Sequence, residues 1–178
     1  MQLAGSTILV CGGASGLGGA TTEMIVAAGG KAVILDININ AGKALTEQLG
    51  RQISYIRADA TDAGQVADAM AAIRRSGPLH GLVCTAGIAV AERVLPKEGV
   101  QPLDHFARVI NINLLGTFNV VRLAAAAMAA NEPNPAGERG VIVMTASVAA
   151  FDGQIGQAAY SASKGGIVSL TLPLAREF

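Results

Sequence analysis

The sequence predicts an α/β protein in which one parallel sheet is covered by helices on both faces. Short, continuously apolar runs alternate along the chain with segments of helical pattern. Strands buried on both faces have this continuous apolar character, whereas strands with one solvated face alternate between apolar and polar residues. The 178 residues are enough for one sizeable core, so we expect a single domain over residues 1–178.

The predicted elements follow one another in a regular order. We expect strands at 6–11, 31–35, 53–57, 80–84 and 140–144, and helices at 16–28, 40–49, 62–75, 104–130 and from about 157 onward. Thr61 or Asp62 is the expected cap of the third helix, because Gln65 follows Asp62 by three residues, as in a capping box. Residues 88–102 mix apolar and charged side chains, which predicts a long loop of the kind that lines binding sites.

Composition excludes several classes of function. Thirteen basic and thirteen acidic residues give a net charge of zero, so we expect neither nucleic acid nor an anionic membrane as a partner. Hydrophobic residues make up 51% of the chain, but no uninterrupted apolar run reaches the length of about eighteen residues that a membrane span needs. The N-terminus has no secretion or import signal, which predicts a cytoplasmic protein. Cys11 and Cys84 each end an apolar strand and are expected to be reduced core residues, and no metal site is predicted.

A glycine-rich turn follows the first predicted strand. Gly12, Gly16 and Gly18 lie between the apolar run that ends at Cys11 and a predicted helix. Glycines let the backbone approach a pyrophosphate closely, and the helix N-terminus adds unpaired N–H groups and a favourable dipole. The 22 glycines of the chain make a chance match possible, but the strand-turn-helix context is the one that a dinucleotide-binding turn requires.

An acidic residue stands where such a fold binds the adenosine ribose. Asp36 ends the second predicted strand, eighteen residues after Gly18. Its carboxylate would bind ribose hydroxyls and repel a 2′-phosphate, and no lysine or arginine at Ser15 or Ile37 offsets that repulsion. The sequence therefore favours NAD over NADP.

Two further strand ends point to the same edge of the sheet. The fourth strand leads into Thr85, Ala86 and Gly87, a small-residue turn that would lie beside the glycine turn if the first and fourth strands are neighbours. Asp59 follows the third strand, where a turn residue and an adenine contact are equally compatible with the pattern. The crevice at this edge is the expected ligand site.

Tyr160 and Lys164 have a spacing that chemistry can use. Four residues apart on a helix, they share one face, so the ammonium can stabilise a phenolate and bring the tyrosine into the range of acid/base catalysis. Ser147, after the fifth strand, could bond the same substrate oxygen. The alternative is an ordinary exposed helix, on which this spacing is common. Asn113 falls on the apolar face of the long helix, where a hydrogen-bonded structural asparagine is the alternative to a functional one.

Taken together, these motifs resemble the short-chain dehydrogenase/reductase family. The resemblance rests on the glycines at 12, 16 and 18, on Asp36, Asp59, the turn at 85–87, Asn113 and Ser147, and on Tyr160 with Lys164, and it runs from Leu3 to Phe178. The segments 86–91, 131–133 and 145–168 are most similar to the type II 3-hydroxyacyl-CoA dehydrogenases. Relatives of this subgroup carry a Leu-Pro step like that at Pro173, so we do not expect Pro173 to end the last helix.

The resemblance implies a role for each residue in a Rossmann-type, NAD-dependent alcohol dehydrogenase of lipid metabolism. Tyr160 would be the general acid/base, Lys164 would lower its pKa and bind the nicotinamide ribose, and Ser147 would hold the substrate oxygen. Asn113 would support a water that relays protons to Lys164. Gln154 and Gln157 would face the substrate, although solvent-facing turn positions fit them equally well. The expected cofactor contacts are Gly12, Ser15, Gly16, Leu17, Gly18, Asp36, Asp59, Ala60, Ala86, Gly87, Tyr160 and Lys164.

Members of the family continue beyond the position that corresponds to Phe178. The resemblance therefore implies that the C-terminal strands and the substrate lid of the family are missing, which leaves one sheet edge and much apolar surface without a cover. The alternative to an active dehydrogenase is a dinucleotide-binding module without catalysis. Family members also pair helices across two-fold axes, so a homo-oligomer, a dimer or tetramer, is expected, with a small molecule, an acyl-CoA, as the substrate.

Overall fold

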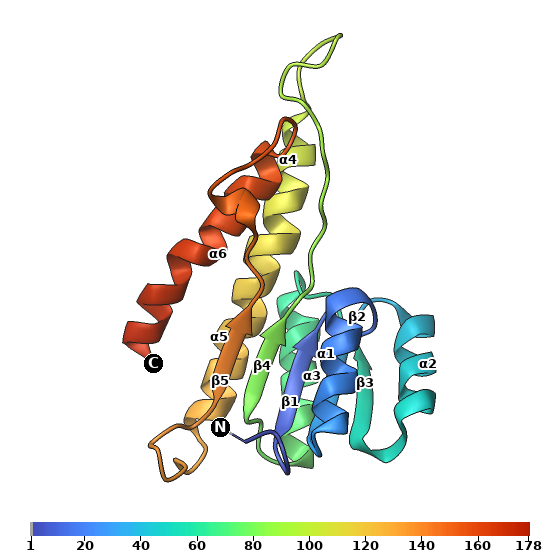
Figure 1. Cartoon of the computed structure of the whole chain (residues 1–178), viewed down its shortest axis with the longest axis vertical. Helices are drawn as coiled ribbons and strands as arrows, with labels where there is room; N and C mark the ends of the chain where they lie inside the picture. The colour runs from blue at the N-terminus through green and yellow to red at the C-terminus, as the bar shows by residue number, and fades with distance from the viewer. Residues whose placement is uncertain (1) are drawn as a thin grey trace.

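Five parallel strands form one sheet in the order β3-β2-β1-β4-β5 (Figure 1). A computed structural model describes residues 2–178 of the chain. The strands are β1 (Thr7–Cys11), β2 (Lys31–Asp36), β3 (Ile53–Arg57), β4 (Gly81–Cys84) and β5 (Val141–Met144), each within one residue of its predicted range. The chain runs outward from β1 to β3 and then crosses back to place β4 beside β1. The strand order therefore reverses between β1 and β4, where open parallel sheets bind their ligands.

Helices cover both faces of this sheet. They are α1 (Gly16–Ala27), α2 (Ile39–Leu49), α3 (Ala63–Ser76), α4 (Leu103–Ile110), α5 (Thr117–Ala129) and α6 (Ala158–Glu177). Helices α1 and α2 pack on one face through Ile25 and Leu45, and α3 and α5 pack on the other through residues such as Val66 and Val120. The predicted α/β class, with a doubly wound parallel sheet, is confirmed.

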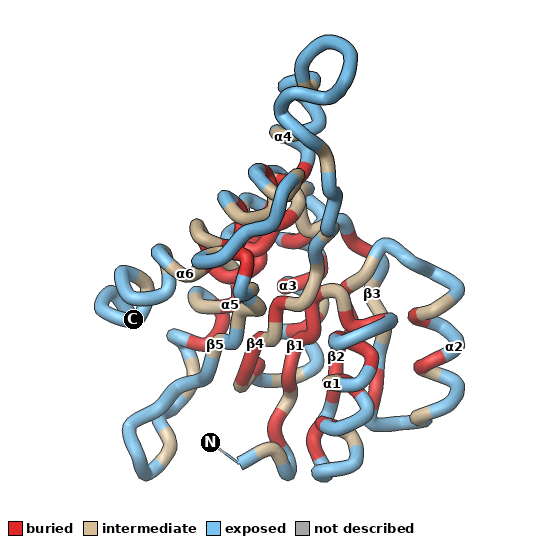
Figure 2. The backbone as a smooth tube through the Cα atoms, turned by 45° about the horizontal axis from the view of Figure 1, so that its top comes forward, coloured by how far each residue is buried: buried red, intermediate tan, exposed pale blue. Residues whose placement is uncertain are grey.

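The core lies on the two sides of the central strand. Ile8 and Val10 of β1 pack toward α1 and α2, whereas Leu9 and Cys11 pack toward α3 and α5, because successive side chains of a strand point to opposite faces. Figure 2 shows the central strands almost entirely buried and α2 mostly exposed at one side of the molecule. Continuous apolar sequence in β1 thus reflects burial on both faces.

Cys11 and Cys84 are free and buried, as expected of core residues. They are directly paired across β1 and β4. A hydrogen bond with Cys11 and burial together raise the pKa of the Cys84 thiol well above its ordinary value, so Cys84 stays protonated at neutral pH.

Asp62 is the cap of α3. Its carboxylate accepts hydrogen bonds from the backbone N–H groups of Gly64 and Gln65, at 2.9 and 3.0 Å. The other half of a capping box would take the Gln65 side chain to the Asp62 N–H, but Gln65 Oε1 instead accepts from the N–H of Asp59 at 3.0 Å. The cap therefore also fixes the chain that leaves β3.

The long helix differs from the regular helix expected over 104–130. Between α4 and α5 the six residues Asn111–Gly116 form a π-helical segment, η2, so the helix is continuous from Leu103 to Ala129 but locally wider. Periodicity cannot reveal such a segment, because one extra residue per turn leaves the flanking patterns intact. This helix is long and apolar enough to cross a membrane, yet 44% of its most apolar window is buried and it packs against α3, α6 and β4.

Helix α6 continues through Pro173, as expected. It packs against α4, η2 and the short 3₁₀ helix η3 (Val148–Ala150), so its first turns lie beside the long helix (Figure 1). The first turns of α6 and the π segment are therefore neighbours.

Strand β5 is the last strand of the sheet and is less covered than the others. Val141 and Val143 are 41% and 48% exposed, whereas Leu9 and Val10 of β1 are completely buried. The expected open edge and uncovered apolar surface are thus present at this strand among the described residues.

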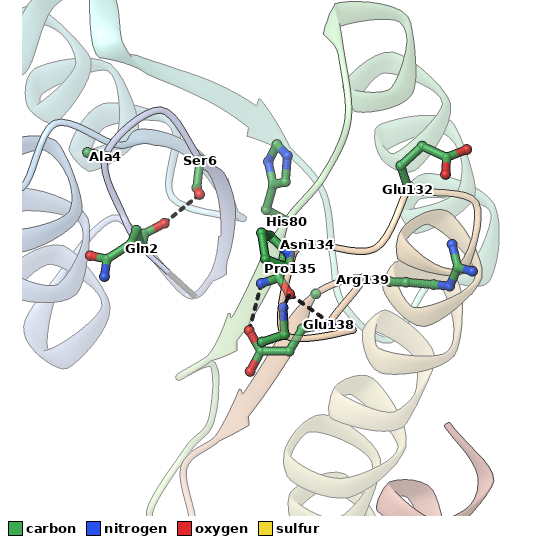
Figure 3. Close-up of a pocket in the computed structure, with 11 residues that line it drawn as sticks. Gln2, Ala4, Ser6, His80, Glu132, Asn134, Pro135, Glu138 and Arg139 are labelled. Carbon is green, nitrogen blue, oxygen red and sulfur yellow. Dashed lines mark hydrogen bonds between the residues drawn. The ribbon is translucent and has the colours of Figure 1, made fainter.

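A pocket of about 490 Å³ lies at the opposite end of the sheet from the glycine turn (Figure 3). It is lined by Ser6, His80 and Gly140, which precede β1, β4 and β5, and by the loop at 132–139. Residues before parallel strands lie at their amino ends, so this pocket is separate from the crevice where the predicted site residues gather.

Candidate active site

The glycine turn after β1 is shaped by contacts that only glycine permits. Gly12 has a φ of +78°, and a Cβ built there would lie 2.6 Å from the backbone nitrogen of Ala86. A Cβ on Gly18 would lie 2.0 Å from the Gly12 carbonyl oxygen. The turn, the start of α1 and the exit of β4 are therefore closely packed, with the Thr85 hydroxyl as the nearest side-chain atom to Gly18.

The N-terminus of α1 is open toward this turn. Ser15 is the N-cap residue in extended conformation, and its side chain makes no capping hydrogen bond. Ser15 and Leu17 are exposed, with Leu17 at 73%. Unpaired N–H groups at a helix start attract a phosphate, so the arrangement suits the predicted anion site.

Asp36 is fastened to the glycine turn from the end of β2. Its Oδ2 accepts a hydrogen bond from the Ala14 N–H at 3.1 Å, and its Oδ1 accepts one from the Asn38 N–H at 2.9 Å. The carboxylate therefore lies at the edge of the turn, where a ribose next to a bound pyrophosphate would be.

The turn at Thr85, Ala86 and Gly87 lies directly beside the glycine turn. The N–H groups of Thr85 and Ala86 both donate to the Cys11 carbonyl, at 2.9 and 3.0 Å, and the Thr85 hydroxyl donates to the same oxygen at 2.9 Å. This is the adjacency that the sequence predicts if β1 and β4 are neighbours, which they are.

Asp59 and Ala60 shape the chain after β3. Asp59 Oδ1 accepts from both the N–H and the hydroxyl of Thr61, each at 2.8 Å. The Ala60 carbonyl accepts from the Asn119 side chain at 2.8 Å. The turn role of Asp59 is therefore visible in the hydrogen bonds, while its adenine contact stays a prediction.

Tyr160 and Lys164 lie on one face of the first turns of α6. Lys164 Nζ is 5.9 Å from the centroid of the Tyr160 ring. The lysine is only 6% exposed, and its ammonium donates to the carbonyl of Thr145, just after β5, at 2.7 Å. Burial lowers the pKa of Lys164 from its ordinary value, with an opposing effect of nearby Cys84. A cation is therefore held next to the phenol by the backbone that leaves the sheet.

Ser147 is the N-cap residue of η3. Its Oγ accepts a hydrogen bond from the Ala149 N–H at 3.1 Å. Because the hydroxyl acts there as an acceptor, its own proton is available for donation to a substrate oxygen.

Gln154 and Gln157 belong to the loop between η3 and α6. The Gln154 N–H donates to the Gln157 side-chain carbonyl at 2.9 Å. Gln154 is exposed and Gln157 is half-buried. Gln157 thus stabilises the loop, and the substrate contacts of both glutamines stay a prediction.

Asn113 is completely buried, and both the oxygen and the nitrogen of its amide are hydrogen-bonded. Its Nδ2 donates to the Ile88 carbonyl at 2.9 Å and to Ser163 Oγ at 3.0 Å, and its Oδ1 accepts from the Ile88 N–H at 2.8 Å. A side chain on Gly87 would come within 3.1 Å of that Oδ1 and 3.9 Å of Lys164 Nζ. The hydrogen-bonded asparagine of the structural alternative is thus present, and it lies next to the predicted catalytic lysine.

Ser163 and Thr145 also belong to the site, although no sequence motif predicted them. Ser163 is completely buried, and its hydroxyl donates to the Tyr160 carbonyl at 2.7 Å while accepting from Asn113. It therefore joins the long helix to the first turn of α6. Its place directly before Lys164, on the buried side of a helix, was the available signal. Thr145 acts through its carbonyl, for which a sequence has no signature.

Comparison with known proteins gives a consistent assignment. A family model described as "short chain dehydrogenase" matches residues 6–178. The chain is 51% identical to 3-hydroxyacyl-CoA dehydrogenase type-2 of Bos taurus over 97% of its own length and 67% of the relative's, and 48% identical to that of Drosophila melanogaster over 95% and 68%.

A solved structure agrees with these relatives. The crystal structure of 3-hydroxyacyl-CoA dehydrogenase type-2 from Mycobacterium avium superposes with a TM-score of 0.93 at 39% identity, covering 99% of this chain and 71% of that one. The chain thus spans about two thirds of the length of the curated relatives it matches. By sequence and by fold, it belongs to the short-chain dehydrogenase/reductase family of oxidoreductase enzymes.

Proposed function

We propose that the chain is an NAD-dependent dehydrogenase that interconverts a secondary alcohol and a ketone, with 3-hydroxyacyl-CoA and 3-ketoacyl-CoA as its substrate class. The observation that carries the proposal is the buried Lys164 ammonium 5.9 Å from the Tyr160 ring. The names of the matched cattle and Drosophila proteins support the substrate class. With that substrate, the protein acts in lipid metabolism.

The residues at the carboxyl edge of the sheet fit a nicotinamide dinucleotide. At Gly12 and Gly18 the neighbouring backbone leaves no room for a Cβ, so the turn has no side chains at these two positions. The start of α1 has no side-chain cap, and its N–H groups suit the pyrophosphate. Asp36 accepts ribose hydroxyls and disfavours a 2′-phosphate, which supports NAD as the cofactor. The other proposed contacts are Ser15, Gly16, Leu17, Asp59, Ala60, Ala86 and Gly87.

The chain's own residues then handle the proton and the substrate oxygen. Tyr160, as phenolate, takes the hydroxyl proton during oxidation and returns it during reduction. Ser147 donates a hydrogen bond to the same oxygen, and Gln154 and Gln157 contact the substrate. The Lys164 ammonium stabilises the phenolate and binds the nicotinamide ribose, while Asn113 supports the water that passes protons to Lys164. A bound nicotinamide ring supplies the hydride acceptor.

Tyr160→Phe tests this assignment. The variant should lose about 100-fold or more of its turnover of acetoacetyl-CoA with NADH, followed by absorbance, because the acid/base proton is gone. NADH binding, measured by fluorescence titration, should change less than about twofold, since the ring remains. Tyr55→Phe makes the same change at the other tyrosine of the chain, where it removes only the hydrogen bond to the backbone carbonyl of Asp36 at 3.0 Å, and it should retain most of the turnover.

Two results would contradict the assignment in different ways. Undiminished turnover in Tyr160→Phe would remove Tyr160 from the chemistry. NADH binding by the unaltered chain without turnover of any hydroxyacyl or ketoacyl thioester would favour the second candidate, a dinucleotide-binding module without catalysis.

We also propose that the chain assembles into a homodimer or homotetramer through its long helix and α6. Leu115 and Phe118, three residues apart on the long helix, are 54% and 43% exposed, and Leu172 on α6 is 56% exposed. Pairing these helices with those of another copy would cover them. Light scattering of the purified chain tests the assembly. A cytoplasmic location is a further proposal, tested by fractionation of the source cells.

A further inference from the structure

Glu92 connects three separate parts of the chain. It lies in the segment 85–102 between β4 and α4. Its carboxylate accepts a hydrogen bond from the Gln101 side chain at 3.0 Å and lies 3.0 Å from His105 Nδ1, in the first turn of α4. Its backbone N–H donates to the carbonyl of Gly156 at 2.8 Å. One residue thus ties its own segment to α4 and to the loop before α6.

The contact between Glu92 and Gly156 is made by backbone atoms of both residues. Gly156 has a φ of +86°, and a Cβ there would lie 3.1 Å from the Glu92 nitrogen. Any side chain at 156 would therefore push the two segments apart. The loop held in this way runs from η3 to α6, and so lies in the chain between Ser147 and Tyr160.

The same segment is anchored at its other end by the catalytic cluster. Ile88, four residues before Glu92, bonds the buried Asn113 through both its N–H and its carbonyl. Ala86 lies against Gly12 of the cofactor turn. From 86 to 92 the chain therefore passes from the cofactor turn, past Asn113, to the loop that follows Ser147.

Beyond Glu92 the segment is exposed and apolar. It projects past the sheet at the end of the molecule where α6 begins (Figure 1). Val94, Leu95 and Val100 are 56%, 71% and 70% exposed. The N–H of Gln101 closes the projection by donating to the Val94 carbonyl at 3.0 Å, and the Gln101 side chain bonds Glu92. Glu92 therefore stands at the base of an apolar projection and fixes both of its ends.

The Glu92 carboxylate is suited to this connection. The hydrogen bonds from Gln101 and His105 lower its pKa, so it is ionised at neutral pH and accepts both bonds as a charged group. Its side chain is 29% exposed, against 53% for His105, so water reaches the pair only in part.

We propose that Glu92 is a positioning residue for the substrate: its carboxylate fixes the base of the projection through Gln101 and His105, which keeps its backbone N–H on Gly156 of the loop at 151–157, and the segment 85–102 thereby sets where the acyl part of the substrate lies. The inference rests on the proposed function, because it assumes that the substrate binds between Ser147 and Tyr160. Glu92 makes no chemical step. Its effect is on the place of the substrate relative to residues that do.

Three variants test the proposal in the full chain. Glu92→Ala removes the carboxylate, and His105→Ala removes one partner. Glu98→Ala is the matched control, since Glu98 is an exposed acid of the same segment with no hydrogen bond or ion pair in the part of the chain that the structure describes. Two measurements are needed: steady-state kinetics with acetoacetyl-CoA and NADH, and hydrogen exchange of the backbone amides at 153–157.

Glu92→Ala should raise the KM for acetoacetyl-CoA about five- to tenfold, the size expected from losing charge-assisted hydrogen bonds at a partly exposed site. Its kcat and its Kd for NADH should stay within about twofold, because the chemical groups and the cofactor turn are untouched. Exchange at 153–157 should rise. His105→Ala should show the same pattern, with a double variant no worse than Glu92→Ala, and Glu98→Ala should match the unaltered chain.

Three outcomes overturn the proposal. Unchanged KM and unchanged exchange in Glu92→Ala would show that the carboxylate, with its bonds to Gln101 and His105, positions nothing. If Glu98→Ala changed KM and exchange as much as Glu92→Ala does, the effects of Glu92→Ala would come from the loss of a negative charge alone. A joint fall of kcat, NADH affinity and melting temperature would show a general loss of structure instead. If the unaltered chain turns over no hydroxyacyl or ketoacyl thioester, both the proposed function and the proposed effect of Glu92 on substrate binding are wrong. The exchange measurement decides separately whether Glu92 ties the two segments.

Discussion

Asn113 and Ile88 form a two-sided clamp: the amide of Asn113 bonds both the N–H and the carbonyl of Ile88, at 2.8 and 2.9 Å. The clamp joins the middle of the long helix to the chain that leaves β4. Because the asparagine is completely buried, its hydrogen bonds form away from bulk water. The stability of the fold and the shape of the proposed site therefore depend on the same side chain.

Asn113→Ala should lower the free energy of unfolding by about 2 to 4 kcal/mol, since it removes the three hydrogen bonds that a completely buried amide makes to Ile88 and Ser163. Urea denaturation measures this. Asn40→Ala, at an exposed position of α2, is the control and should stay within about 0.5 kcal/mol. Similar losses in both variants would contradict a special role for the clamp.

Gly18→Ala should abolish measurable NADH binding and lower stability, because its Cβ would meet the Gly12 carbonyl at 2.0 Å. Fluorescence titration and thermal unfolding check the two effects. Gly165→Ala provides the contrast: nothing lies within 4 Å of its Cβ, and alanine in a helix interior should stabilise by about 0.5 to 1 kcal/mol. NADH binding by Gly18→Ala with normal affinity would show that the close packing of the turn is unnecessary.

Asp36→Ser should change the choice of cofactor. Removing the carboxylate removes its repulsion of a 2′-phosphate, so the ratio of NADPH to NADH affinity should rise about tenfold or more. Fluorescence titration with both dinucleotides measures the ratio. Asp68→Ser, an exposed acid of α3, should leave it unchanged. An unaltered ratio in Asp36→Ser would place the ribose elsewhere.

Lys164 should make the free energy of unfolding depend on pH in the alkaline range. Burial lowers its pKa in the folded protein, whereas in the unfolded chain the pKa returns to about 10.5. At a pH between the folded and the unfolded pKa of Lys164, the unfolded state binds more protons than the folded state. Below the folded pKa the buried ammonium therefore destabilises the folded protein. This destabilisation is relieved as the pH rises toward 10.5. The free energy of unfolding, relative to Lys164→Met, should therefore rise with pH over that window.

Urea denaturation at a series of pH values above neutrality follows this difference. The same comparison with Lys43→Met, at an exposed position of α2, is the control for removing a lysine that is not buried. A difference for Lys164 that falls with pH would mean that the ammonium is stabilised by its surroundings.

Local patterns predicted most of the fold, because each strand and helix here is specified by its own residues. Continuous apolar runs located all five strands, and the glycines, Asp36 and the interval from Tyr160 to Lys164 are motifs whose members lie close together in sequence or at strand ends. Parallel strands bring their carboxyl ends to one edge, so the neighbouring position of the turn at Thr85 could be predicted as well.

What the sequence could not reveal depends on contacts between distant residues or on backbone atoms. Ser163 reaches Asn113 across fifty positions, and Glu92 reaches Gly156 through backbone alone. Thr145 holds Lys164 by its carbonyl, which every residue type possesses. The π-helical segment changes the number of residues per turn without changing their polarity, so no periodicity marks it.

Because of the wider turn around Asn113, the two halves of the long helix are rotated differently about the helix axis. An α-helix advances about 100° per residue, so one additional residue in a turn rotates everything after it relative to everything before it. The half before the segment can direct Asn113 toward Ile88 while the half after it directs Val120 and Ala124 toward the sheet. Deleting a single residue from the π-helical segment would remove this difference in rotation between the two halves. Either Asn113 would then point away from Ile88, or Val120 and Ala124 would point away from the sheet.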